Sequence, residues 1–255
     1  MKILWVFAHP EPRSMNASLL ADGLDQLSLL GHETRVSDLY AMRWDPVLGP
    51  PDLGTGAAGR LYVGKEQERA FREGGLSPDV RAEQEKLEWA DAVVFQFPLW
   101  WLGPPAILKG WFDRVLTQGF AFGLRDGAGR ALRYGDGGLR GRRALVITSY
   151  GARESAFGPR GVHGQLDEVL FPLLHGTFWY TGMRALRPFA VDDADRMSEA
   201  DYKEHAERLR ARLRALDTET PIPYRHEAGG DYDERLTVRA ELAPGREGLA
   251  VHRTG

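Results

Sequence analysis

Short apolar segments alternate with helical patterns along this chain, and this alternation restricts the fold more than any other feature of the sequence. The segments lack the polar–apolar alternation of a half-exposed strand, so each is expected to be a strand buried on both faces. The predicted strands are Lys2–Ala8, Thr34–Ser37, Ala92–Phe97, Ala144–Ser149 and Ala185–Ala190. Strands that alternate with helices predict an α/β fold with a doubly wound, five-stranded parallel sheet, and we expect the strand order 2-1-3-4-5.

Apolar residues at helical spacing predict the intervening helices, at Asn16–Leu30, Val80–Trp89, Pro105–Thr117, Val162–Gly182 and Ser198–Leu216. Residues 123–141 hold seven glycines in 19 positions and are predicted as a long loop of functional interest. Residues 221–255 are polar and cannot form a core of their own. We therefore predict a catalytic domain over residues 1–220 and an extension, residues 221–255, that packs on this domain or on a partner subunit.

The composition excludes several classes of function. The formal net charge of −3 does not favour nucleic acid or an anionic membrane as partner. The chain has no cysteine, so disulfides, zinc–thiolate sites and cysteine nucleophiles are excluded, and its seven histidines show no metal-ligand spacing. No apolar run approaches the roughly 20 residues of a membrane span, and the chain opens directly on a predicted strand. The sequence predicts a soluble cytoplasmic protein without a metal site.

Three loops are candidates for the functional site, because ligands of doubly wound sheets lie beyond the carboxyl ends of the strands. The loop after the first strand, His9–Asn16, ends in Ser and Asn just before a helix and contains Arg13. Such a helix start can bind a phosphate, but it can equally be an ordinary N-capped turn. No G-x-G-x-x-G or phosphate-binding P-loop motif occurs, so the usual Rossmann binding of a nicotinamide cofactor is not expected.

The loop after the third strand, Pro98–Pro104, contains the adjacent tryptophans Trp100 and Trp101. One of them can be a core or dimer-interface residue, but both cannot easily point inward, so at least one is expected to line a cleft. The loop after the fourth strand, Thr148–Gly151, offers hydroxyls and backbone N–H groups. These would suit the polar edge of a flavin ring, although taken alone the segment can be a simple polar exit from a strand.

His163 lies between two glycines, in Gly161-Val162-His163-Gly164. Close backbone access and a side chain that titrates near neutrality suit a role in proton handling, although a single histidine is more often structural. No G-x-S-x-G nucleophile motif supports a hydrolase. The arginine-rich run over residues 207–214 is expected to be a solvated helix face rather than a nucleic-acid site.

Taken together, these residues resemble the flavodoxin-like NAD(P)H:quinone oxidoreductases of the DT-diaphorase type. The resemblance rests above all on Phe95–Val115 and continues in Ser37–Met42, Gly75–Val80 and Gly161–Gly164. It implies a homodimeric flavoprotein with FAD at the dimer interface. NAD(P)H and a small quinone would take turns over the same flavin face, in a ping-pong reaction that passes hydride through flavin N5.

The resemblance also implies roles for individual residues. The phosphates and adenosine side of FAD would contact His9, Met15, Asn16 and Ser18. The flavin ring would be framed by Pro98, Leu99, Trp100, Trp101 and Leu102, and its polar edge would be bonded by Thr148, Ser149, Tyr150 and Gly151. The substrate cavity would be lined by Trp101, Phe122, Leu124, Phe157 and His163.

The sequence departs from the family pattern at some of these positions. The catalytic tyrosine of the family falls on Phe157, and its paired pocket tyrosines fall on Phe122 and Leu124. We therefore expect His163, with Tyr150, to carry the catalytic role. FAD is expected rather than FMN. Two alternatives stay open: an azo or nitro reductase that uses the same flavin site, and a regulatory flavoprotein subunit of a potassium efflux system.

Overall fold

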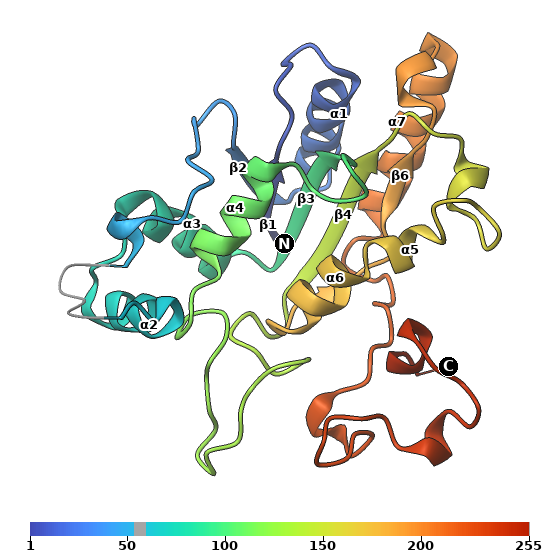
Figure 1. The fold of residues 1–255 in the computed structure, drawn as a ribbon. Coiled ribbons are helices and arrows are strands. Elements are labelled where there is room, and N and C mark those ends of the chain that lie inside the picture. Colours follow the sequence, from blue (N-terminus) through green and yellow to red (C-terminus); the bar gives the residue numbers. More distant parts are fainter. Residues whose placement is uncertain (54–59, 255) are drawn as a thin grey trace.

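A parallel sheet runs through the centre of the computed structural model, which describes residues 1–53 and 60–254 (Figure 1). Its strands are β1 (Lys2–Phe7), β2 (Glu33–Asp38), β3 (Ala92–Pro98), β4 (Arg143–Ser149), β5 (Arg184–Ala185) and β6 (Phe189–Val191). The order β2-β1-β3-β4-β5 confirms the predicted α/β fold and strand order.

The last predicted strand, Ala185–Ala190, is in fact two short strands that both pair with β4. β5 pairs with Arg143 and Ala144, whereas β6 pairs with the segment from Ile147 to Ser149. Pro188 lies between β5 and β6 and has no N–H to donate to the ladder, so the pairing is interrupted there.

Helices cover both faces of the sheet (Figure 1). The long ones are α1 (Met15–Leu29), α2 (Val63–Glu73), α3 (Pro78–Trp89), α4 (Ala106–Val115) and α7 (Glu199–Arg214). On one face, Trp5 and Leu145 pack with Leu209 of α7 in a fully buried cluster. On the other face, Phe95 packs on Trp111 of α4 and stacks on Phe178, with ring centroids 5.8 and 4.9 Å apart. The alternation of the strands thus supplies two separate cores.

The predicted helix Val162–Gly182 is broken into pieces. Its first residues form turns, and the short helices α5 (Leu166–Val169) and α6 (Phe171–Leu173) lead into a π-helix, Leu174–Trp179. Two residues explain the breaks. Gly164 has a left-handed φ of +79°, and Pro172 has no N–H for an intrahelical bond, so it is placed in the first turn of α6.

The segment from residue 221 onward, here called the extension, lies at the amino ends of the strands, together with the long loop 123–141 (Figure 1). Its two ends are held against each other, since Tyr224 and Arg253 form an antiparallel bridge. It is fixed to the domain by ion pairs of Glu227 with Arg133 (2.6 Å) and of Arg253 with Asp167 (2.7 Å).

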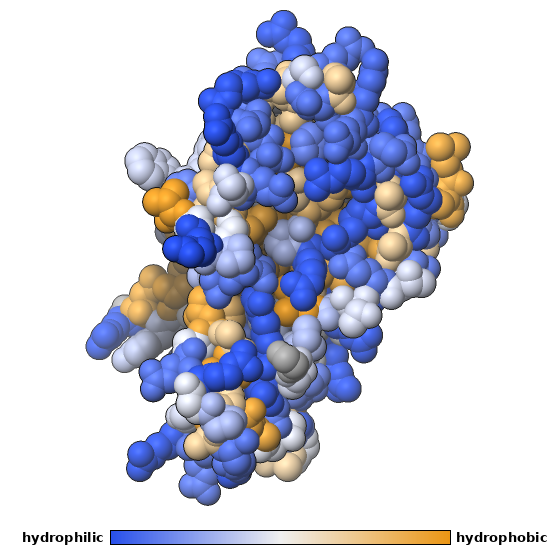
Figure 2. All heavy atoms as spheres, turned by 90° about the vertical axis from the view of Figure 1, so that its right-hand side faces the viewer, coloured by the Kyte–Doolittle hydropathy of each residue, from blue (hydrophilic) through white to orange (hydrophobic). Residues whose placement is uncertain are grey.

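Hydrophilic side chains cover most of the face drawn in Figure 2, and apolar residues appear there as small separate patches. Within residues 1–53 and 60–254, no helix combines the length and the apolar character needed to cross a membrane.

Candidate functional site

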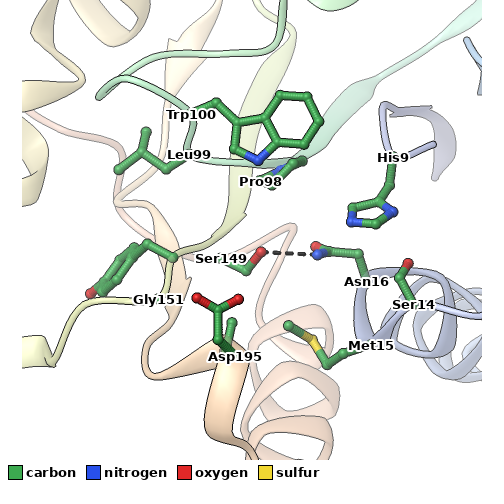
Figure 3. Close-up of a pocket in the computed structure, with 12 residues that line it drawn as sticks. His9, Ser14, Met15, Asn16, Pro98, Leu99, Trp100, Ser149, Gly151 and Asp195 are labelled. Carbon is green, nitrogen blue, oxygen red and sulfur yellow. Dashed lines mark hydrogen bonds between the residues drawn. The ribbon is translucent and has the colours of Figure 1, made fainter. Parts of the chain in front are cut away.

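The loops after β1, β3, β4 and β6 enclose one cleft of about 280 Å³ at the carboxyl ends of the strands (Figure 3). Its walls are formed by His9, Ser14, Met15, Asn16, Pro98, Leu99, Trp100, Ser149, Tyr150, Gly151, Ala194 and Asp195. The three loops chosen from the sequence therefore meet at one site, which is where doubly wound sheets bind their ligands.

The first turn of α1 faces this cleft. Ser14 is the N-cap, and its hydroxyl oxygen accepts a hydrogen bond from the Ala17 N–H (3.1 Å). The first turn of α1 contains no acidic residue. The remaining free N–H groups and the helix dipole therefore favour a negatively charged group at this end of the cleft.

A chain of buried hydrogen bonds connects the loops after β1 and β4. Asn16 Nδ2 donates to Ser149 Oγ (2.9 Å), and the Asn16 carbonyl accepts from Gln96 Nε2 (2.7 Å). Gln96 Oε1 accepts in turn from the Trp5 indole (3.0 Å). Asn16 is only 4% exposed, yet its Oδ1 has no partner among the described residues. A buried acceptor without a partner costs free energy, which a ligand that donates a hydrogen bond in the cleft would recover.

The two tryptophans lie on a strained turn. Trp100 and Gly103 exchange backbone hydrogen bonds of 3.0 Å, while Trp101 and Leu102 between them have φ values of +51° and +59°. Such a turn normally uses Asn-Gly, because side chains other than glycine cost energy in this left-handed region. Trp100 lines the cleft, whereas the Trp101 side chain is fully exposed. The turn thus holds a large aromatic side chain in water beside the cleft, at an energetic cost.

Asp195, which sequence reasoning missed, enters the cleft from the segment after β6. Figure 3 shows its carboxylate beside Gly151. A Cβ atom at position 151 would overlap this carboxylate, so only glycine permits the approach. The acidic run Asp192-Asp193-Ala194-Asp195 directly after the last strand is the sequence signal that could have indicated it.

Three aromatic side chains form a row that runs from the cleft to His163. The Tyr150 ring packs on Phe157 (centroids 4.3 Å apart), and Phe157 packs on the His163 ring (4.8 Å). Burial, reinforced by Asp192 and Glu154, raises the pKa of the Tyr150 phenol to about 12. Tyr150 is therefore a neutral hydrogen-bond donor throughout the physiological range of pH.

The structure does not bring every predicted residue into the cleft. Ser18 is exposed on α1, and the Thr148 hydroxyl is used within the sheet, where it donates to the Phe97 carbonyl (2.9 Å). Trp101 and Leu102 are on the exposed turn beside the cleft. Phe122 lines a separate cavity of about 320 Å³, which also contains Tyr180. Leu124 follows Phe122 in the long loop, where its carbonyl accepts from the Leu132 N–H.

Comparisons with known proteins agree with this geometry. A family model described as a flavodoxin-like fold matches residues 1–213. A ribosyldihydronicotinamide dehydrogenase-like protein from Penicillium crustosum is 42% identical over 235 residues, 91% of this chain and 87% of that protein. The rat NAD(P)H dehydrogenase [quinone] 1 is 36% identical over 224 residues, 87% of this chain and 79% of that protein. A crystal structure of a candidate quinone reductase from Klebsiella pneumoniae has a TM-score of 0.95 at 43% identity, covering 99% of both chains.

Proposed function

Because this chain belongs to the flavodoxin-like family of NAD(P)H:quinone oxidoreductases, we propose that it reduces small quinones by two electrons through a tightly bound flavin. NAD(P)H is the donor, and the cytoplasm, where this donor is supplied, is the proposed place of action. The proposal rests on one observation: the N-terminus of α1, the polar residues that follow β4 and the exposed tryptophan turn lie together at one cleft.

The residues of the cleft fit a flavin. The start of α1 would take the phosphate, and Asn16 Oδ1 would accept from the cofactor a hydrogen bond that none of the described residues supplies. Ser149 and the Gly151 backbone would bond the polar edge of the ring, because the Tyr150 N–H already donates to Val191 and its carbonyl already accepts from Ala194. A flavin held by these residues would supply the two-electron hydride chemistry between donor and quinone, in the ping-pong order that we propose. FAD is the proposed form of the cofactor.

The substrates would stack beside the tryptophan turn. Trp101 offers the exposed aromatic face, so donor and quinone would lie against it in turn. Phe122 lines the other cavity and therefore does not complete this wall within one chain. We therefore propose a homodimer in which Phe122 of the partner subunit closes the substrate site.

His163 and Tyr150 would hydrogen-bond to the reacting rings and stabilise the charge that develops there. Phe157 has no hydroxyl, and it holds the His163 ring at the end of the aromatic row. The neutral Tyr150 phenol can donate a hydrogen bond to negative charge that develops on the ring edge. The His163 imidazole offers ring nitrogens that can donate or accept a hydrogen bond at the reacting rings.

A second donor is favoured by one observation. Several relatives that cover 87% or more of this chain, the human one among them, are named ribosyldihydronicotinamide dehydrogenases. These names point to a reduced nicotinamide riboside, which lacks the adenosine diphosphate half of NAD(P)H. The riboside is therefore an alternative donor at the same site.

Two measurements test the proposal. The first identifies the flavin released when the purified protein is denatured, and FAD is expected. The second is steady-state turnover of a simple quinone with NADH, NADPH or reduced nicotinamide riboside. Release of FMN would refute FAD alone, and a flavin-free protein would refute the proposed chemistry. A flavin-loaded protein with negligible turnover for all three donors would favour the regulatory subunit.

A further inference from the structure

A third cavity, of about 250 Å³, lies where three distant parts of the chain meet, away from the cleft. The long loop contributes Tyr134, the α6–π-helix segment contributes Phe171 and His175, and the extension contributes the rest of the wall. The residues from the extension are Glu227, Tyr232, Leu236 and His252. Neither the sequence motifs nor the proposed reaction uses this cavity.

His175 is the unusual member of the wall. It is 7% exposed, and its Nε2 is buried without a hydrogen-bond partner in the described part of the chain. Its ring is stacked between Phe171 (centroids 4.6 Å apart) and Tyr134 (4.9 Å). Burial, followed by the nearby His252 and Arg253, lowers the pKa of His175 to about 4, so the imidazole is neutral at pH 7. A neutral, unsatisfied imidazole in an aromatic setting is suited to one hydrogen bond from a ligand.

The backbone around this cavity is strained in the same way as the tryptophan turn. Tyr134 and Leu236 both line the cavity, and they have φ values of +44° and +63°. Left-handed residues other than glycine cost energy and gather at ligand sites. Strain at two positions of one wall, Tyr134 beside His175 and Leu236 in the extension, also indicates a binding site.

The charges beside the cavity indicate a neutral ligand. Arg133 is paired with Glu227 (2.6 Å), Arg225 with Asp231 (2.5 Å) and Arg253 with Asp167 (2.7 Å). Each of these cations already has an acidic partner, so an anionic ligand would have to break an existing ion pair. The Glu227 carboxylate in the wall would repel an anion further.

We propose that this cavity binds a small neutral phenol. The aromatic ring of the ligand would pack against Phe171 and Tyr134. Its hydroxyl would bond to the imidazole of His175 or of His252, whose rings lie 5.3 Å apart. A phenol both donates and accepts, so it satisfies either tautomer of a neutral imidazole, which an aromatic hydrocarbon of the same size cannot do. This inference does not depend on the proposed quinone reduction.

The test is titration of the purified holoenzyme with 4-fluorophenol, followed by the ¹⁹F resonance of the ligand. His175→Phe keeps an aromatic ring between Phe171 and Tyr134 and removes both nitrogens, so we expect binding about tenfold weaker. His252→Phe, in the half-buried wall, is a second variant in case His175→Phe does not fold. Trp101→Ala is the control for binding in the cleft and should leave the affinity unchanged.

Weaker binding in either histidine variant, with unchanged binding in Trp101→Ala, supports the proposal. Wild-type affinity in both histidine variants overturns it, as does the absence of binding to the wild-type holoenzyme. Loss of binding in Trp101→Ala alone would assign the phenol to the cleft and overturn it too. Quinone turnover is measured separately, so failure of the proposed reaction is distinguished from failure of this site.

Discussion

Asn16 and Ser149 are 133 positions apart in the chain, and the Asn16 Nδ2 donates to Ser149 Oγ over 2.9 Å in the floor of the cleft. This bond fixes the start of α1 against the end of β4, and it directs the Asn16 amide so that its Oδ1 has no partner among the described residues. The two loops that would hold opposite ends of a flavin are therefore positioned by one side chain.

Asn16→Ala should weaken flavin binding about tenfold, because it removes one acceptor for the ligand and the bond that positions Ser149. The measurement is the dissociation constant of flavin from the reconstituted apoprotein. Asp25→Ala, an exposed change on the same helix, is the matched control and should bind flavin normally. Unchanged affinity in Asn16→Ala would show that the buried oxygen does not meet the cofactor.

Trp101→Ala should raise KM for both donor and quinone by about three- to tenfold while flavin retention stays normal, because the exposed ring would stack on the substrates rather than on the cofactor. Steady-state kinetics and the flavin content of the purified protein check this expectation. Leu29→Ala, another highly exposed apolar residue, serves as the control. Loss of flavin from this variant would contradict the assignment and would mean that Trp101, rather than Trp100, contacts the cofactor.

His163→Ala should slow the reduction of the bound flavin by NADPH by about 10²-fold, the typical contribution of a positioned acid–base group. Stopped-flow measurement of flavin absorbance gives this rate. Tyr150→Phe keeps the ring on Phe157 and removes only the hydroxyl. Because the pKa of Tyr150 is raised to about 12, this variant should not change the pH profile in the neutral range. An unchanged rate in His163→Ala would exclude a role for that residue.

His175 should make the protein less stable in acid. Burial first, then His252 and Arg253, lower its pKa to about 4 from an ordinary value near 6.5. Between these values the unfolded chain binds a proton that the folded chain does not, so stability falls as pH decreases from 6.5 to 4. The loss should be about 2 kcal/mol between roughly pH 7 and pH 5. Urea unfolding at both values checks it, with His175→Phe expected to lack this part of the dependence. Equal loss in both proteins would contradict the assignment.

Much of the fold follows from local patterns in the sequence. Ala92–Pro98 is apolar at every position except Gln96 and is buried throughout, as expected of a strand inside a sheet covered on both faces, and such strands indicate the fold class. The errors have local causes. Pro188 divides the last strand, and Pro172 breaks a helix whose apolar spacing looked continuous. The helix Val63–Glu73 was missed because it is mostly charged and has few apolar residues to mark a buried face.

The site was harder to predict than the fold. The loops after β1, β3 and β4 could be chosen from topology alone, and they do meet in the cleft. Asp195 was missed because the loop after the last predicted strand was not considered with the other three, although the acidic run over residues 192–195 marks it. Thr148 was predicted to face the ligand but does not line the cleft, because its hydroxyl donates to the Phe97 carbonyl within the sheet. Phe122 would belong with this cleft only through the proposed second subunit, which no pattern along one chain reveals.

The base of the long loop 123–141 shows which part of this molecule can change. A methyl group on Gly138 would overlap the Phe120 carbonyl, and one on Gly137 would overlap the backbone of Thr181. At the tip of the loop, a methyl group on Gly127 would meet no atom of the described residues within 4 Å, whereas Gly129 has the same space but a left-handed φ of +80° that favours glycine. Side chains are therefore excluded at the base of the loop, whereas Gly127 at its tip can be replaced. Extra residues inserted at the tip would therefore leave the sheet and its cleft in place.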